Sequence, residues 1–260
     1  MAKKRSTATR RAESLAASER AAAIRREQER KERRRRSLVV TLVGVAVLAI
    51  VLVVGIAVRS AQDTTGADAG TPAGAVQTYA LPVGRTSAPV TVDVYEDFMC
   101  PICGEFEKAS NSWLQEYAAQ GKVAIRYHAI SILDRASNGT DYSTRSASAL
   151  GAVLDASGPE VAKKFHDLLY ADQPEENSDG LSDDRLVDLA VQAGATRDQV
   201  RPAVEKRSYE QWVKNSTDAT DKLDGFQGTP FVRVDGKALQ GASIDQLSAN
   251  LKQQVDAAQS

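Results

Sequence analysis

The sequence contains two cysteines, Cys100 and Cys103, separated only by Pro101 and Ile102. Each can form a disulfide only with the other or with a second molecule. A zinc site of this kind uses four Cys or His ligands, and no second cysteine pair is present to complete one. A disulfide that closes so short a loop constrains the unfolded chain little, which argues against a purely structural bond. The spacing therefore favours a redox-active pair over a structural disulfide or a metal site.

The cysteine pair falls where a predicted strand gives way to a predicted helix. Residues 89–95 alternate and are rich in β-branched side chains, which indicates a strand. From Pro101 to Gly121 apolar residues recur at spacings of three and four, which indicates a helix. Cys100 then lies at the helix N-terminus, where free N–H groups and the helix dipole lower a thiol pKa from its usual ~8.5. We expect Cys100 to be the nucleophile and Cys103 to be the more buried, resolving cysteine.

Two further segments follow this helix. Residues 122–133 are predicted to form a second strand, and residues 142–224 are helical in period almost throughout. Breaks in this helical block are expected at residues 157–159, at residues 177–180 and around Gly194. The block is therefore predicted to hold several helices.

The C-terminal part returns to strand character. Residues 231–234 followed by the turn dipeptide Asp235-Gly236 predict a β-hairpin. A final helix is expected to begin after the cap candidate Ser243, because apolar residues then recur at helical spacing to the end of the chain. The predicted order is strand, helix, strand, helical block, hairpin and helix.

The stretch from Ala88 to Cys103, APVTVDVYEDFMCPIC, resembles the active-site segment of the DsbA-like thioredoxin family. A second stretch, from Gly228 to Val232, resembles the cis-proline loop of that family, which packs beside the cysteine pair. The helical block between them is similar to the insertion that distinguishes DsbA-like proteins from plain thioredoxin. The resemblance covers residues 76–257 and implies an α/β thioredoxin fold with a helical insertion.

The resemblance also implies roles for single residues. The residues that it assigns to catalysis are Cys100, Cys103, Thr229 and Pro230. A cis bond before Pro230 would leave the Thr229 backbone free to pair with an extended substrate, whereas the alternative is an ordinary proline at the start of a strand. Thr229, Phe98 and Ile102 are expected to contact the substrate, although an aromatic at a strand end such as Phe98 is equally consistent with core packing.

Two positions depart from the family pattern. Ile102 stands where the strongly oxidising prototype has a histidine that stabilises the thiolate, so an extremely oxidising potential is not expected. Val94 stands six residues before the nucleophile, where family members often carry a buried glutamate. Glu96 or Asp97 is a candidate replacement as proton acceptor, and the alternative is that both are solvent-facing acids.

The two histidines, His128 and His166, are isolated in the sequence from each other and from other ligand types. We interpret both as structural or exposed side chains rather than as metal ligands or members of a catalytic triad. No metal and no cofactor is expected.

Residues 38–58 contain 21 residues without charge, all of them apolar or glycine except one threonine. At ~1.5 Å per residue such a helix spans the ~30 Å hydrocarbon core of a bilayer. Residues 1–36 carry a net charge of +9 and the remainder of the chain a net charge of −10. Because basic flanks stay in the cytoplasm, the C-terminal domain is expected outside.

The predicted organisation is a cytoplasmic basic tail at 1–37, a transmembrane anchor at 38–58, a linker at 59–75 and the thioredoxin-type domain at 76–260. The apolar stretch is longer than that of a cleaved signal peptide, so an uncleaved anchor is expected; cleavage near Ser60 is the alternative. Five glutamates interleave with the basic residues of the tail, which argues against a nucleic-acid partner.

These features together predict a single-pass protein of the cell membrane, a thiol–disulfide oxidoreductase that donates disulfides to reduced secreted or envelope proteins. A disulfide reductase or isomerase is the alternative, because isomerases of this fold often have a threonine where Thr229 stands. A binding module without chemistry is a third. The resemblance implies reoxidation by a membrane partner of the DsbB or vitamin K epoxide reductase type, and a monomer is expected.

Overall fold

The structure is a computed structural model that describes residues 70–259. The predicted cytoplasmic tail, the predicted membrane anchor and most of the predicted linker lie outside the described residues. Within residues 70–259, no helix combines the length and the apolar character that crossing a bilayer requires.

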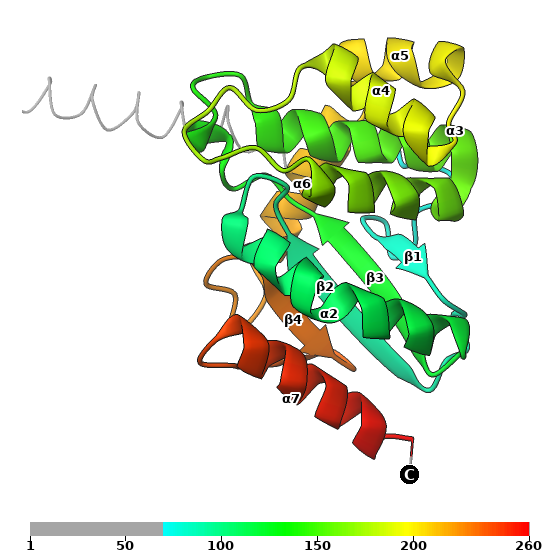
Figure 1. The fold of residues 1–260 in the computed structure, drawn as a ribbon, viewed down its shortest axis with the longest axis vertical. Helices are drawn as coiled ribbons and strands as arrows, with labels where there is room; N and C mark the ends of the chain where they lie inside the picture. The colour runs from blue at the N-terminus through cyan, green and yellow to red at the C-terminus, as the bar shows by residue number, and fades with distance from the viewer. Residues whose placement is uncertain (1–69, 260) are drawn as a thin grey trace, which may run out of the picture. The chain divides into compact units, whose positions relative to one another are not determined.

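A five-stranded sheet in the order β1-β3-β2-β4-β5 forms the centre of the domain (Figure 1). Its strands are β1 (Leu81–Val83), β2 (Val90–Glu96), β3 (Val123–Ala129), β4 (Phe231–Val234) and β5 (Lys237–Ala238). The central strands β2 and β3 run parallel, and every other pair is antiparallel. All but one residue of β2 are buried, including the charged residues Asp93 and Glu96, because both faces of this central strand are covered.

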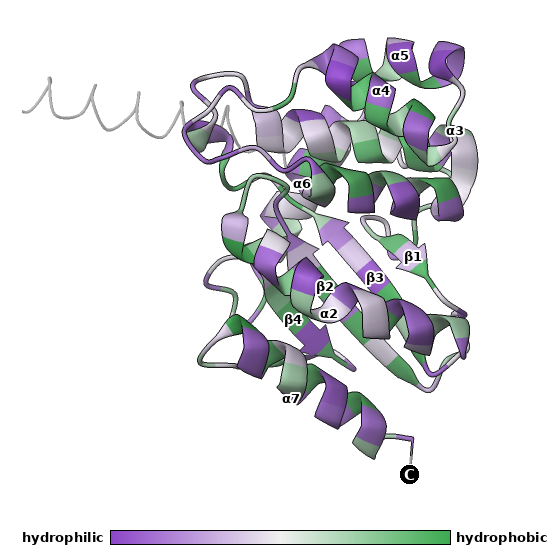
Figure 2. Cartoon of the chain, in the orientation of Figure 1, coloured by the Kyte–Doolittle hydropathy of each residue, from purple (hydrophilic) through white to green (hydrophobic). Residues whose placement is uncertain are grey.

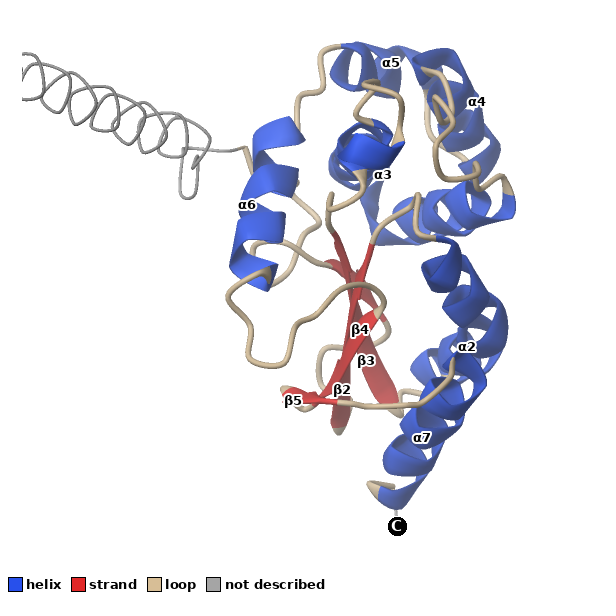
Figure 3. Ribbon diagram, turned by 90° about the vertical axis from the view of Figure 1, so that its left-hand side faces the viewer, coloured by secondary structure: helices blue, strands red, loops and turns tan. Residues whose placement is uncertain are grey.

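Helices surround the sheet on both faces. They are α2 (Pro101–Ala119), α3 (Tyr142–Ala171), α4 (Asp183–Ala193), α5 (Arg197–Glu205), α6 (Glu210–Thr220) and α7 (Ile244–Ala257), with a 3-10 turn at Asp134–Ala136. Figure 3 shows α2 and α7 on one face of the sheet and α6 on the other, with α3, α4 and α5 gathered beyond the end of the strands. The predicted α/β fold with a helical insertion is confirmed.

The helices are amphipathic, and Figure 2 shows apolar and polar residues alternating along each of them. In α7 the buried residues Leu247, Leu251 and Val255 recur every fourth position, so one stripe faces the core. Ser243 caps this helix as predicted, because its side chain accepts a hydrogen bond from the N–H of Gln246.

The predicted breaks and turns are present. Gly158 has φ 79° and ψ 175°, and α3 bends there. Gly194 ends α4 with φ 115°, a left-handed conformation that favours glycine. In the hairpin between β4 and β5, Asp235 and Gly236 both have positive φ, as a tight two-residue turn requires.

The structure differs from the prediction in three places. The strand predicted over 122–133 ends at Ala129, because the N–H groups of Ser131 and Ile132 donate to side chains of other segments instead of to a strand. Strand β1 is absent from the predicted order of elements, because its three residues are too few to show an alternating pattern. Residues 70–75, placed in the linker, pack on the domain: Pro72 is buried, and the N–H of Ala73 donates to the carboxylate of Asp155.

Candidate active site

The cysteine pair lies at the N-terminus of α2, just beyond the end of β2. Cys100 is the N-cap residue and Pro101 the first helical residue, a position where the missing N–H of proline costs nothing. The carbonyl oxygen of Cys100 accepts hydrogen bonds from the N–H groups of Cys103 at 3.1 Å and Gly104 at 3.3 Å. Both cysteines are free thiols, and Cys103, 1% exposed, is more buried than Cys100, 6% exposed, as expected.

The register of the sheet brings a distant loop to this pair. Strand β2 pairs with β4 so that Tyr95 lies opposite Phe231, which places Thr229 and Pro230 beside the start of α2. The Sγ of Cys100 lies 3.6 Å from the carbonyl oxygen of Thr229. The Thr229–Pro230 peptide bond is cis, as the resemblance implied.

The two thiols have opposite acidities. A hydrogen bond from the side chain of Cys103 is the largest influence on Cys100, and it lowers the pKa of that thiol to about 6 although burial acts in the other direction. Thr229 and nearby backbone N–H groups lower this pKa further. Burial raises the pKa of the Cys103 thiol well above its usual value, and the neighbouring Cys100 adds to this effect. At neutral pH the pair therefore holds a thiolate at Cys100 and a proton at Cys103.

A groove of about 870 Å³ runs beside the pair between α2 and α7. Ile102 and Pro230 line one part of it and Leu247 another. Ile102 is 50% exposed and is the only large apolar side chain in residues 70–259 that is exposed. An apolar residue beside a reactive thiol can contact the side chains of a protein substrate.

Phe98 requires a correction. Its side chain is fully buried, with ring centroids 5.6 Å from His166 and 5.2 Å from Tyr170. It therefore presents no surface to a substrate and packs in the core behind the active-site turn. The assignment of Phe98 as a substrate-binding residue is wrong, and its alternative as a core residue holds.

The two acids at the end of β2, Glu96 and Asp97, are not solvent-facing. Asp97 is fully buried, and its carboxylate accepts hydrogen bonds from the N–H groups of Met99, Ile132 and Leu133. Burial raises the pKa of Asp97 to about 6, while the hydrogen bonds that it accepts limit the rise. Asp97 therefore ties the turn before Cys100 to the loop after β3.

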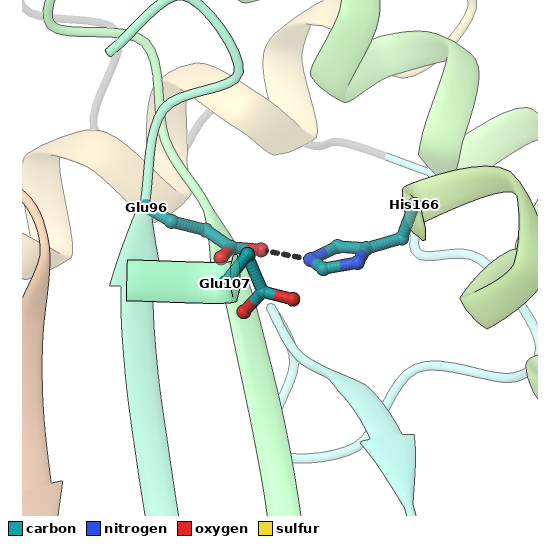
Figure 4. Close-up of side chains that lie close together, drawn as sticks. All are labelled: Glu96, Glu107 and His166. Atoms are coloured by element: carbon teal, nitrogen blue, oxygen red, sulfur yellow. Dashed lines mark hydrogen bonds and ion pairs between the residues drawn. The ribbon is translucent and has the colours of Figure 1, made fainter. Parts of the chain in front are cut away.

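Glu96 and His166 form a buried pair that the sequence did not reveal. The Nε2 of His166 lies 2.5 Å from Oε1 of Glu96, and Glu107 lies beside them (Figure 4). The description of His166 as isolated is therefore wrong, because α3 folds back over the end of β2. Glu107 left one signal: it is a charged residue on the buried stripe of a helix, four positions after Cys103. His128, which contacts Asp93 at 3.0 Å and stacks on Tyr95, is structural as expected.

Gln173 is a second residue that sequence reasoning missed. It follows α3, and its side-chain amide donates to the carbonyl oxygens of Phe98 at 3.1 Å and Cys100 at 2.9 Å. A side chain at position 104 would overlap the Gln173 amide oxygen, so the close approach depends on Gly104. No pattern in the sequence connects these residues, because 69 positions separate them.

Comparisons with known proteins agree with this geometry. A profile of the family described as Thioredoxin matches residues 77–253. The chain is 32% identical over 155 residues to the serine/threonine-protein kinase PknE of Mycobacterium tuberculosis, an alignment covering 58% of this chain and 27% of that protein. This chain thus matches only about a quarter of the length of that curated relative.

Two solved structures from Mycobacterium tuberculosis have a similar fold. The reduced form of the disulfide bond oxidoreductase DsbG is 30% identical with a TM-score of 0.59, covering 69% of this chain and 91% of that chain. The reduced form of DsbA is 29% identical with a TM-score of 0.58, covering 69% of this chain and 96% of that chain.

Proposed function

The chain belongs to the thioredoxin family, and on this premise we propose that it is a protein thiol–disulfide oxidoreductase that donates a disulfide through Cys100 and Cys103. One observation carries the proposal: Cys100 caps the N-terminus of α2 in front of the buried thiol of Cys103, an arrangement that lowers the pKa of Cys100 to about 6. The Thr229 carbonyl, 3.6 Å from Cys100 Sγ, lies where an extended substrate can pair with the backbone.

The reaction begins with the disulfide form. A substrate thiolate attacks Sγ of Cys100, the Cys100–Cys103 bond breaks, and Cys103 takes up a proton because its pKa is high. A second substrate thiolate then attacks the substrate sulfur of the mixed disulfide, and Cys100 leaves as a thiolate. The substrate loses two electrons and the enzyme gains them. The low pKa of Cys100 favours this direction, because a stable thiolate is the better leaving group.

The site of action that we propose is the outer face of the cell membrane, with residues 38–58 as the anchor. The uncharged stretch and the basic segment before it support this orientation. The proposed substrates are reduced secreted or envelope proteins, and a membrane oxidase of the DsbB or vitamin K epoxide reductase type restores the disulfide. Protease added to spheroplasts that express the full chain should digest the domain; a protected domain would contradict the orientation.

Trapping the mixed disulfide tests the reaction. Cys103 can also attack Sγ of Cys100 in the mixed disulfide and expel the substrate as a thiolate. Cys103→Ser removes this route of release, so the full chain should accumulate reducible adducts with secreted proteins through Cys100. The matched control is Cys100→Ser with Cys103→Ser, which should form none. A variant Cys103→Ser without adducts would count against any thiol–disulfide exchange.

A second candidate is a reductase or isomerase that uses the same site, which the threonine before the cis-proline favours. The reduction potential separates the two. A reduction potential of about −120 mV would indicate a disulfide donor, and one of about −270 mV would indicate a reductant. Equilibration with glutathione buffers measures it.

A further inference from the structure

Three side chains with metal-ligating atoms meet in the core, one helical turn beyond Cys103 (Figure 4). Glu96 is the last residue of β2, Glu107 belongs to α2 and His166 to α3. None is more than 4% exposed. Their ligand atoms all lie within 4.8 Å of one another, so three separate elements place two carboxylates and an imidazole around one point.

The polar atoms at this point are not all satisfied by the protein. Both carboxylate oxygens of Glu107 and Oε2 of Glu96 have no hydrogen-bond partner within the described part of the chain. An ionised carboxylate that is buried without partners is strongly unfavourable. The nearby Lys163 does not donate to these carboxylate oxygens, because its ammonium group is bonded to Asp167 and to Asn111. Two carboxylates therefore face a single imidazole.

We propose that Glu96, Glu107 and His166 bind one divalent cation of the zinc class. Carboxylate oxygens and imidazole nitrogens are ligands that Zn²⁺ takes at ~2.0–2.2 Å, which puts the ligand atoms of one ion ~3–4 Å apart. His166 Nε2 and Glu96 Oε1 are hydrogen-bonded at 2.5 Å in this structure, so an ion would replace this contact and move the two side chains apart. A cation of charge two also neutralises both carboxylates while the imidazole stays neutral.

The other nitrogen of the imidazole supports the assignment. His166 Nδ1 makes no hydrogen bond within the described residues, and the carboxylate oxygen of Asp167 that lies 3.5 Å away is the group it can turn to. Histidines that bind a metal through one nitrogen commonly direct the other N–H at a carboxylate, which fixes the orientation of the ring. Asp167 and Lys163 in turn line a groove of about 610 Å³ that opens to solvent.

The cation has a structural consequence that is separate from disulfide exchange. It would join the end of β2, the active-site helix α2 and the helical insertion through α3. Metal binding stabilises the folded state by mass action, so the melting temperature should depend on Zn²⁺.

The first experiment uses the full-length chain in its disulfide form, in which neither cysteine can bind metal. After equilibration with Zn²⁺ and removal of excess, we expect one zinc per chain by elemental analysis. Zn²⁺ in hundredfold excess over its dissociation constant should raise the melting temperature by about 5–10 °C, and a chelator should reverse the rise. Wild-type chain with less than a tenth of an equivalent of zinc and no thermal shift would overturn the proposal and assign a proton to Glu107 instead.

Matched variants locate the ion. Glu107→Gln and Glu96→Gln should each lose at least nine-tenths of the bound zinc, because an amide is a much weaker ligand. The control is Glu105→Gln, the same change at an exposed position of the same helix, which should keep one zinc per chain. Co²⁺ in place of Zn²⁺ should give visible absorption bands in wild type and control only. Zinc retained in full by Glu107→Gln would show that the ion binds elsewhere.

Discussion

The side-chain amide of Gln173 donates a hydrogen bond of 2.9 Å to the carbonyl oxygen of Cys100, 73 residues earlier in the chain. The same nitrogen also contacts the carbonyl oxygen of Phe98. Gln173 lies two residues after the end of the long helix α3, so the helical insertion holds the backbone on either side of Met99. The position of the nucleophile therefore depends on two parts of the fold, the sheet that delivers it and the insertion that holds it.

Substitution of Gly104 tests this contact. Gly104→Ala should destabilise the domain by about 1–2 kcal/mol, because the new methyl group displaces Gln173 and its two hydrogen bonds are lost. In a Gln173→Ala background the same change should become neutral or stabilise by up to about 1 kcal/mol, since alanine is the better helix former. Urea denaturation of the four proteins measures the coupling. Equal effects of Gly104→Ala in both backgrounds would contradict the contact.

The acidity of Cys100 should depend on the donor at position 103. Cys103→Ala removes the hydrogen bond that lowers the pKa of Cys100 most, so this pKa should rise from about 6 towards the usual ~8.5. Cys103→Ser keeps an O–H donor and should cause a smaller rise. The ultraviolet absorbance of the thiolate, followed against pH, measures both. A larger rise in the serine variant than in the alanine variant would contradict the assigned cause.

The pH dependence of stability follows from the same thiol. In the reduced form the folded pKa of Cys100, about 6, lies below the unfolded value of ~8.5. At this residue the unfolded state therefore binds more protons between these values, and the contribution of Cys100 to the free energy of unfolding rises with pH in this window. This stabilisation is complete above ~8.5 and is lost as pH falls through 6. The raised pKa of Cys103 opposes it only above ~8.5.

We therefore expect the reduced protein to gain stability over the oxidised protein from pH 6 to pH 8.5, and to equal or slightly exceed it at pH 7. Chemical denaturation of both forms across this range measures the difference. Cys100→Ser, compared with the reduced wild type, should lose the slope. An oxidised form that is clearly more stable at pH 7 would favour the reductase over the donor.

Ile102 offers a way to change the potential. It is half exposed beside Cys100, so a histidine there can carry its charge close to the thiolate. Ile102→His should lower the pKa of Cys100 from about 6 to about 5 and make the pair more oxidising. Ile102→Gln, polar but uncharged, is the control and should leave both quantities nearly unchanged. Redox equilibration with glutathione measures the potential, and an equal change in both variants would exclude a charge effect.

Local patterns allowed much of the architecture to be predicted. Alternation in β2, three- and four-residue spacing in α2, the Asp235-Gly236 turn and the Ser243 cap each depend on neighbours within a few positions. The strand predicted over residues 122–133 shows the limit of this reasoning, because β3 ends at Ala129. Its end is decided by Asp97 and Thr217, whose side chains take the N–H groups of the following loop.

The cysteine pair and its place at a helix N-terminus could be predicted from the sequence alone, because spacing and helix polarity are properties of a short segment. The pKa of Cys100 depends also on Thr229, which lies 129 residues away in the chain. Three features could not be predicted: Phe98 faces the core, Gln173 holds Cys100, and Glu96, Glu107 and His166 converge. These contacts join β2, α2 and α3, and a side chain's partners across such distances depend on how the elements pack rather than on the residues that flank it.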